Sequence, residues 1–119
     1  MERRALGDAG ESVALRFLQR AGLKLVLRNY RCKAGEIDLV MLDGATLAII
    51  EVRYRSSLDF GGAAASVTPR KQRRIVLAAR HLLLTRRDLR RYRARFDVVG
   101  VMAALPDSEV EWIKAAFTM

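Results

Sequence analysis

The sequence contains few of the residues that cross-link small folds. Its 119 residues include one cysteine, Cys32, one histidine, His81, and two prolines. A single cysteine cannot form an internal disulfide, and one cysteine with one histidine cannot supply the ligands of a Cys/His zinc site. Disulfide scaffolds and zinc fingers are therefore excluded.

Long apolar segments are also absent. The longest uncharged apolar runs cover residues 44–50 and 98–105, whereas a membrane-spanning helix needs roughly 18 residues. At the N-terminus an acid, Asp8, occurs before any hydrophobic stretch develops, so no signal peptide is expected. We therefore expect a cytoplasmic protein with no membrane partner.

Acidic residues are scarce relative to basic ones. The chain has 22 Lys+Arg against 13 Asp+Glu and a formal net charge of +9. Residues 70–95 alone hold eleven basic side chains and one acid, Asp88. Because most of the basic residues are arginines, whose planar guanidinium matches phosphate oxygens, a nucleic acid, most readily DNA, is the expected partner. A GC-rich genome would also raise the arginine content, without functional meaning.

The apolar content is high enough for a folded core. Hydrophobic residues make up 51% of the chain, and a chain of this length buries roughly two-thirds of its unfolded surface on folding. This excludes a disordered basic tail. No repeat or linker divides the sequence, so residues 1–119 are expected to form a single domain.

Hydrophobic periodicity predicts two main helices and about five strands. Helical spacing covers residues 8–21, and a second helix begins at Thr68-Pro69, an N-cap followed by proline, with its apolar stripe at residues 75, 78, 79, 82 and 83. Strands are predicted at residues 23–31, 37–42, 46–52, 96–105 and 110–113, and residues 56–66 are predicted to form a loop. The order α-β-β-β-α-β-β predicts an α/β fold with a mixed sheet flanked by the two helices.

The dipeptide Asp43-Gly44 favours a two-residue hairpin turn. Such a turn would place Leu42 opposite Ala45, and alternation by two would then sort the side chains of both strands. One face would carry only apolar residues: Ile37, Leu39, Met41, Ala48, Ile50 and Val52. The other face would gather charged residues at the end away from the turn: Glu36, Asp38, Glu51 and Arg53.

In that register Glu36 lies opposite Glu51, and Asp38 is their diagonal neighbour. Two carboxylates about 4 Å apart repel by roughly 4 kcal/mol at an effective dielectric near 20, so a positive group must compensate them. A divalent cation is one possibility, and oxygen ligands favour Mg²⁺ or Mn²⁺. The alternative is a structural ion-pair network with Arg53 and Arg55.

Four segments resemble a known family: residues 35–40 (GEIDLV), 50–55 (IEVRYR), 70–75 (RKQRRI) and 95–99 (RFDVV). They are similar to the YraN family of uncharacterised bacterial proteins, which is grouped with restriction-endonuclease-like nucleases near the archaeal Holliday-junction resolvases. The resemblance implies the restriction-endonuclease-like fold and a possible homodimer, since resolvases work as dimers.

By this resemblance, Asp38 and Glu51 match the two metal-binding acids, and Glu11 matches an acid on the first helix. An Asp8/Glu11 capping box is the structural alternative for Glu11. Arg53 occupies the position of a lysine thought to orient or deprotonate the attacking water. Arginine cannot act as a base, but it could hold the water or neutralise the transition state.

The expected function is therefore a metal-dependent endonuclease that cleaves DNA, with branched or junction DNA as the substrate that the resemblance implies. The expected catalytic residues are Asp38, Glu51, Arg53, Glu11 and Glu36, with Asp38 and Glu51 as ligands of Mg²⁺ or Mn²⁺. The expected nucleic-acid contacts are Arg55, Arg70, Lys71, Gln72, Arg73 and Arg74. The alternative is a nucleic-acid-binding or protein-interaction module that keeps the nuclease fold without turnover.

Overall fold

The computed structural model describes residues 3–54, 62–102 and 109–118. Its elements in chain order are α1 (Arg3–Arg20), β1 (Lys24–Cys32), β2 (Gly35–Asp43), β3 (Thr46–Tyr54), α2 (Gly62–Ala65), α3 (Pro69–Thr85), the 3₁₀ turn η1 (Arg87–Leu89), β4 (Arg93–Val101) and β5 (Val110–Phe117). None of the described helices is long and apolar enough to cross a membrane.

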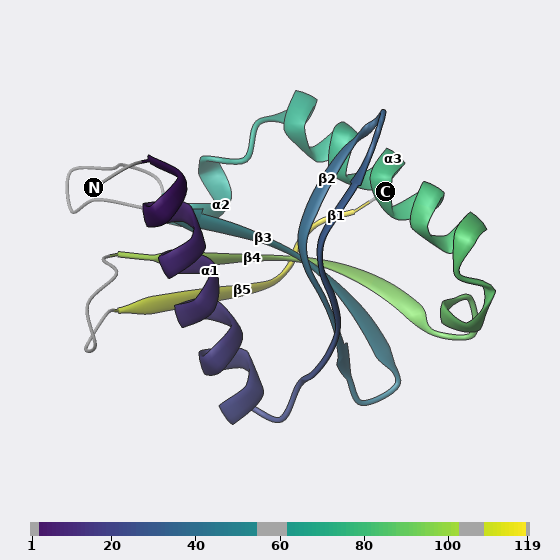
Figure 1. The fold of residues 1–119 in the computed structure, drawn as a ribbon, viewed down its shortest axis with the longest axis horizontal. Helices are drawn as coiled ribbons and strands as arrows, with labels where there is room; N and C mark the ends of the chain where they lie inside the picture. Colours follow the sequence, from purple (N-terminus) through teal and green to yellow (C-terminus); the bar gives the residue numbers. More distant parts are fainter. Residues whose placement is uncertain (1–2, 55–61, 103–108, 119) are drawn as a thin grey trace.

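The five strands form one sheet in the order β1-β2-β3-β4-β5. All neighbouring strands are antiparallel except β3 and β4, which are parallel and are connected through α2 and α3. A parallel pair requires such a crossover, whereas β2 and β3 need only a tight turn. The expected mixed α/β architecture, with the order α-β-β-β-α-β-β, is confirmed (Figure 1).

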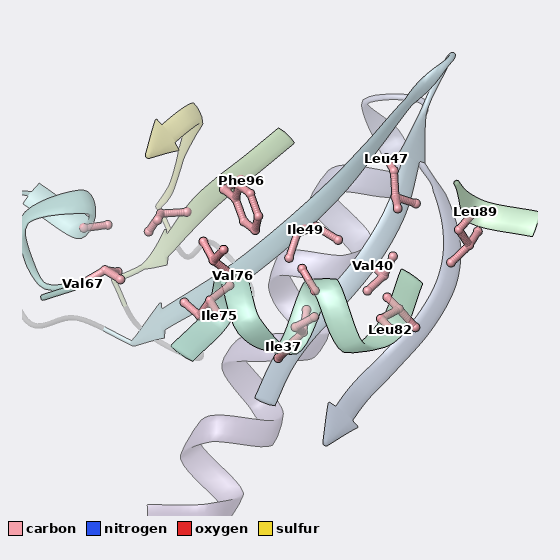
Figure 2. Close-up of a cluster of buried hydrophobic side chains, with 14 residues drawn as sticks. Ile37, Val40, Leu47, Ile49, Val67, Ile75, Val76, Leu82, Leu89 and Phe96 are labelled. Carbon is pink, nitrogen blue, oxygen red and sulfur yellow. The ribbon is translucent and has the colours of Figure 1, made fainter. Parts of the chain in front are cut away.

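Helices α1 and α3 cover opposite faces of the sheet, and each face has its own core. Ala14 and Leu18 of α1 pack on Leu39, Met41, Ala48 and Ile50. On the other face, the predicted stripe of α3 packs on side chains that include Val40, Leu47, Ile49 and Phe96 (Figure 2). The expected N-cap is also confirmed, because the Thr68 side chain accepts a hydrogen bond from the Lys71 amide and Pro69 occupies the first turn.

Two element boundaries differ from the sequence-based prediction. Helix α1 begins at Arg3 rather than at Asp8, because the preceding residues include alanine, leucine and arginine, which favour helix. Asp8 thus lies inside the helix and does not cap it. Part of the predicted 56–66 loop is the short helix α2, whose Ala63 is fully buried in the core on the α3 side; residues 55–61 lie outside the described part of the chain.

The hairpin turn also lies one residue later than predicted. Asp43 pairs with Thr46, and Leu42 pairs with Leu47 instead of Ala45. Gly44 has φ +60° and Ala45 does not have a positive φ, which fits a type II′ turn with glycine at its first central position. The pairing is shifted by two residues, and a shift of two does not by itself move a side chain to the other face.

Alternation fails at one point, the start of β2. Ile37 packs with the α3 core, whereas Leu39 packs with the α1 core, although both were predicted on the same face (Figure 2). On the neighbouring strand, Asn29 has φ +54° and lies between Arg28 and Tyr30, the partners of Leu39 and Ile37. The alternation of β2 reverses at Asp38, beside this left-handed residue of β1.

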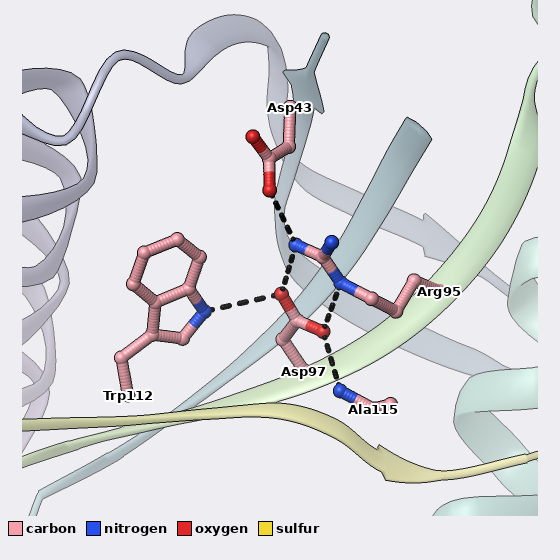
Figure 3. Close-up of polar contacts among 5 residues, drawn as sticks. All are labelled: Asp43, Arg95, Asp97, Trp112 and Ala115. Atoms are coloured by element: carbon pink, nitrogen blue, oxygen red, sulfur yellow. Dashed lines mark hydrogen bonds and ion pairs between the residues drawn. The ribbon is translucent and has the colours of Figure 1, made fainter. Parts of the chain in front are cut away.

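A buried polar network joins β4 to β5 and to the hairpin turn (Figure 3). The Asp97 carboxylate is fully buried. It accepts hydrogen bonds from Arg95 Nε at 2.8 Å, Arg95 Nη2 at 2.9 Å, Trp112 Nε1 at 3.1 Å and the Ala115 amide at 3.0 Å. Arg95 also donates to Asp43 at 2.9 Å. Asp97 thus pairs with an arginine inside the core, and its hydrogen-bond partners give it a structural role.

Replacing Asp97 with alanine is expected to destabilise the fold by about 3–5 kcal/mol, because it leaves the Arg95 guanidinium, the indole and a backbone amide without their buried acceptor. Urea unfolding measures this change. Asp88→Ala is the matched control, since Asp88 pairs with Arg86 on the surface and its loss should change stability little. Equal losses in the two variants would contradict a structural role for the buried network.

Candidate functional site

The candidate site lies where β2 and β3 separate. Their pairing ends at Leu39 and Ile50, and beyond this point the two strands diverge, with the start of α3 above them (Figure 1). Asp38 Oδ2 accepts a hydrogen bond from the Val52 amide at 2.8 Å. The Asp38 carboxylate therefore takes the place of a main-chain acceptor in the gap between the strands, which fixes its position.

Glu51 is the acid that Asp38 meets. Glu51 is only 8% exposed. Burial, a hydrogen bond to Asp38 and repulsion from the Asp38 charge raise the pKa of Glu51 from 4.5 to about 9. The two carboxyl groups thus converge, as expected, but the corrected register brings Asp38, rather than Glu36, to Glu51. At neutral pH the pair retains a proton unless a cation replaces it.

Two cations lie near this pair. Lys71 Nζ is 4.0 Å from Glu51 Oε2, and both Lys71 and Arg53 lower the pKa of Glu51 by their charge. Arg53 Nε donates to Ser66 Oγ at 3.0 Å, and Ser66 Oγ donates to the Ala63 carbonyl. The guanidinium is thereby tied to the end of α2, whereas the Lys71 ammonium makes no hydrogen bond within the described part of the chain.

The proximity of Lys71 to Glu51 was not predicted from the sequence. The signal was nevertheless present, because Lys71 precedes Ile75 by four residues and Ile75 begins the buried stripe of α3. Residues four apart share a helix face. A lysine on the apolar side of an amphipathic helix points toward the sheet, where an acid is its natural partner.

Glu11 lies beside the acid pair, but its carboxylate already has an arginine as its ion-pair partner. It is 7% exposed and accepts two hydrogen bonds from Arg28, at 3.1 and 3.0 Å. Burial raises the pKa of Glu11, Arg28 opposes this, and the Asp38 charge raises it further. The structure therefore places this acid near Asp38 and gives it an ion-pair partner that the sequence analysis did not anticipate.

Glu36 does not lie opposite Glu51, which corrects the prediction. Its side chain is 62% exposed and its Oε2 lies 3.3 Å from Arg31 Nε, and Arg31 is also its partner in the β1–β2 ladder. The reversal of alternation beside Asp38 removes Glu36 from the acid pair. Glu36 lies at the rim of the cavity described next.

A cavity of about 700 Å³ opens above Glu51. One wall is the end of the β1–β2 hairpin, with Arg31, Cys32, Lys33, Gly35 and Glu36, and the other is the first two turns of α3 with the residue before it, with Thr68, Arg70, Lys71, Arg74 and Ile75. Five of these side chains are basic and two are acidic. The site thus has one buried acid, Glu51, at its floor between basic walls.

The predicted nucleic-acid contacts fall into four groups. Arg70, Lys71 and Arg74 line the cavity. Arg73 is exposed but does not line it. The Gln72 side chain donates to the Val67 carbonyl at 3.1 Å, so its amide braces the turn before α3. Arg55 lies outside the described residues.

Comparison with known proteins places this chain in a family. Residues 10–101 match the model of the "Uncharacterised protein family UPF0102". The chain belongs to the UPF0102 family. The expected membership of an uncharacterised bacterial family is thereby confirmed.

Individual UPF0102 relatives match almost the whole chain. A protein of Cupriavidus taiwanensis is 56% identical over 97% of this chain and 84% of its own length. One of Herminiimonas arsenicoxydans is 51% identical over 96% and 87%, and one of Pseudomonas putida is 47% identical over 93% and 90%. Their names state the family and no activity.

The donor set of this UPF0102 chain suits a hard divalent cation. Within the described ranges, no group of three or more His, Cys, Asp or Glu side chains is arranged to hold a metal. Asp38 and Glu51 supply two oxygen-bearing groups beside an open cavity. Mg²⁺ is commonly held by one or two carboxylates, with water and phosphate completing the shell. The residues present fit such an ion, because they bring two carboxyl groups together and Glu51 is buried.

The pH dependence of stability tests the acid pair. With the folded pKa of Glu51 near 9 and its ordinary value 4.5, the folded UPF0102 protein binds more protons than the unfolded chain between these values. Stability without divalent ions should therefore fall as pH rises through this window. Glu51→Gln, which stays neutral, should flatten the dependence and unfold at higher urea concentration than wild type at about pH 9.

Urea unfolding in a chelator, measured from about pH 5 to about pH 9, makes this comparison. The raised pKa of Glu11 adds a slope of the same sign to both proteins, so the difference between them isolates Glu51. Parallel curves for the two proteins would contradict convergence of the carboxyl groups.

Proposed function

We propose that this UPF0102 protein is a metal-dependent endonuclease that hydrolyses DNA phosphodiesters, with Asp38 and Glu51 as the ligands of Mg²⁺ or Mn²⁺. One observation carries the proposal: two acids from adjacent strands meet, and one of them, Glu51, lines a cavity whose walls are basic. Buried acids that repel one another are costly unless a cation joins them, and basic walls suit a phosphate-bearing substrate.

The bound ion would supply an activated water and polarise the phosphate. The chain's own residues supply orientation and charge. Asp38 is held by the Val52 amide, so its position does not depend on the ion. Lys71 places an ammonium group beside Glu51, where it can stabilise charge that develops on the phosphate oxygens.

The restriction-endonuclease-like resemblance supports this proposal. The order of helices and strands matches what the resemblance implies, and the two acids come from neighbouring strands of the same hairpin. The likeness to archaeal Holliday-junction resolvases is the basis for branched or junction DNA as the substrate, and for a homodimer as the working assembly.

A second function has a specific observation in its favour. Arg53 takes the lysine position of the nuclease pattern, and its Nε is engaged with Ser66. Because a guanidinium does not lose its proton in proteins, this residue cannot serve as a base. The alternative is a DNA-binding module that has the same fold and does not cleave.

Cleavage assays separate the two functions. Labelled linear, forked and four-way DNA is incubated with the protein in Mg²⁺ and in Mn²⁺. Asp38→Asn and Glu51→Gln are expected to lower the cleavage rate by more than about 100-fold, since even partners of metal ligands cost about 10–100-fold when replaced. Both substitutions preserve side-chain size.

Glu111→Gln is the matched control, since Glu111 is an exposed acid on β5, and it should cleave as wild type does. Cleavage that survives both site substitutions would reveal a contaminating nuclease and contradict the proposed site. Binding without cleavage in either metal would establish the non-catalytic module instead.

Lys71 and Arg73 provide a second matched pair on one helix. Lys71→Ala removes the ammonium beside Glu51 and is expected to lower kcat by about 10²-fold or more, the usual cost of losing a transition-state donor. Arg73→Ala removes an exposed charge outside the cavity and should leave kcat unchanged. Single-turnover cleavage with DNA affinity measured in parallel shows whether Lys71 acts in the reaction or only in binding. Equal effects on kcat would overturn the assignment.

A further inference from the structure

The end of the β1–β2 hairpin faces the start of α3 across the cavity, and it carries Arg31 and Lys33. We propose that these two residues form a second phosphate-binding wall, so that the cavity holds the sugar–phosphate backbone of one unpaired nucleic-acid strand between the hairpin and α3. This inference rests on the proposed function and extends it, because the sequence analysis assigned DNA contacts only to Arg55 and to the start of α3.

The two walls are held at a fixed separation. Gly35, which begins β2, lies against the backbone of α3: a side-chain carbon at this position would come within 3.0 Å of the Arg74 carbonyl oxygen and 3.2 Å of Arg74 Cβ. Only glycine allows so close an approach without displacement. The end of the hairpin is therefore packed against α3. This contact fixes the position of the segment that carries Arg31 and Lys33 relative to the helix.

Most cations of the two walls have no acidic partner among the described residues, apart from Lys71 beside Glu51. In the part of the chain that the structure describes, Lys33, Arg70 and Arg74 make no ion pair, and Arg31 has only the exposed contact with Glu36. An exposed pair of this kind contributes little free energy. The cations of α3 also lie at its N-terminal end, where the helix dipole disfavours positive charge. Phosphates between the walls would compensate these charges.

The lining of the cavity identifies the class of ligand. Among the described residues that line it there is no aromatic side chain, so it offers no surface on which bases stack. Cations on two facing walls, with Glu51 between them, surround one backbone rather than contact the outside of a duplex. The ligand is thus a single strand, gripped through its phosphates with no preference for base sequence.

Binding measurements with a double variant test this inference. Arg31→Ala/Lys33→Ala is compared with Arg20→Ala/Lys24→Ala, which removes the same charge from exposed residues outside the cavity lining. Fluorescence anisotropy with a labelled single-stranded oligonucleotide in a chelator gives affinity as a function of salt. Each phosphate contact to a single strand contributes about 0.7 to the slope of log K against log salt, so the hairpin variant should lose about 1.4 and the control almost nothing.

Glu36→Gln is expected to increase the affinity for the oligonucleotide, an effect that a misfolded variant would not show. The Glu36 carboxylate competes with phosphate for Arg31, so its neutralisation should tighten binding of the oligonucleotide several-fold. The same substitution in the Arg31→Ala background should give a smaller gain. A duplex of the same length and sequence, measured beside the single strand, should bind less tightly to wild type.

The outcomes distinguish this inference from the proposed function. Equal loss of salt slope in the two double variants, no gain from Glu36→Gln, or tighter binding of the duplex would overturn the second wall or its single-strand ligand while leaving cleavage at Asp38 and Glu51 intact. Failure of the wild-type protein to cleave any DNA would refute the proposed nuclease activity. The binding measurements on the Arg31→Ala/Lys33→Ala variant would still decide whether the second phosphate-binding wall exists. Absence of any nucleic-acid binding would refute both.

Discussion

The contact between the Asp38 and Glu51 carboxyl groups is the constraint around which the site is arranged. Two ionised carboxylates about 4 Å apart would repel by roughly 4 kcal/mol at an effective dielectric near 20, a large fraction of the 5–15 kcal/mol by which domains are usually stable. The pair therefore keeps a proton at neutral pH when no cation is bound. The strands separate at this point, and a main-chain amide holds Asp38 in the gap. The two apolar cores on either face of the sheet hold the strands that carry the acids in place.

A comparison within the molecule shows why this pair differs from a structural one. Asp97 is more deeply buried than Glu51, yet it accepts hydrogen bonds from a guanidinium, an indole and a backbone amide. Its charge is fully compensated. Glu51 has another acid as its hydrogen-bond partner and one ammonium at 4.0 Å. The fold can thus compensate a buried carboxylate with hydrogen-bond donors, and at the floor of the cavity it compensates Glu51 only in part.

Much of this arrangement could be predicted from residue patterns, because period-two alternation is insensitive to a two-residue shift of register. The hairpin turn was placed one residue too early, yet Asp38 and Glu51 were still assigned to one site. Alternation could not predict the reversal between Ile37 and Leu39, since it assumes that side chains change face at every residue. That reversal moved Ile37 to the α3 core and Glu36 to the surface. The Arg28 partner of Glu11 was missed for the related reason that contacts between distant elements are not encoded in local spacing.

The position of Lys71 bears on the arginine at residue 53. A lysine on a strand and a lysine on the first turn of a helix packed across that strand can both place an ammonium group beside the same acid. Here Arg53 is bound to Ser66, whereas Lys71 lies on the stripe of α3 that faces the sheet and approaches Glu51 from above. An arginine in the strand position therefore does not leave the acid pair without an amine. The packing of the helix on the sheet decides which side chain supplies positive charge beside an acid. A sequence pattern confined to one hairpin does not contain this information.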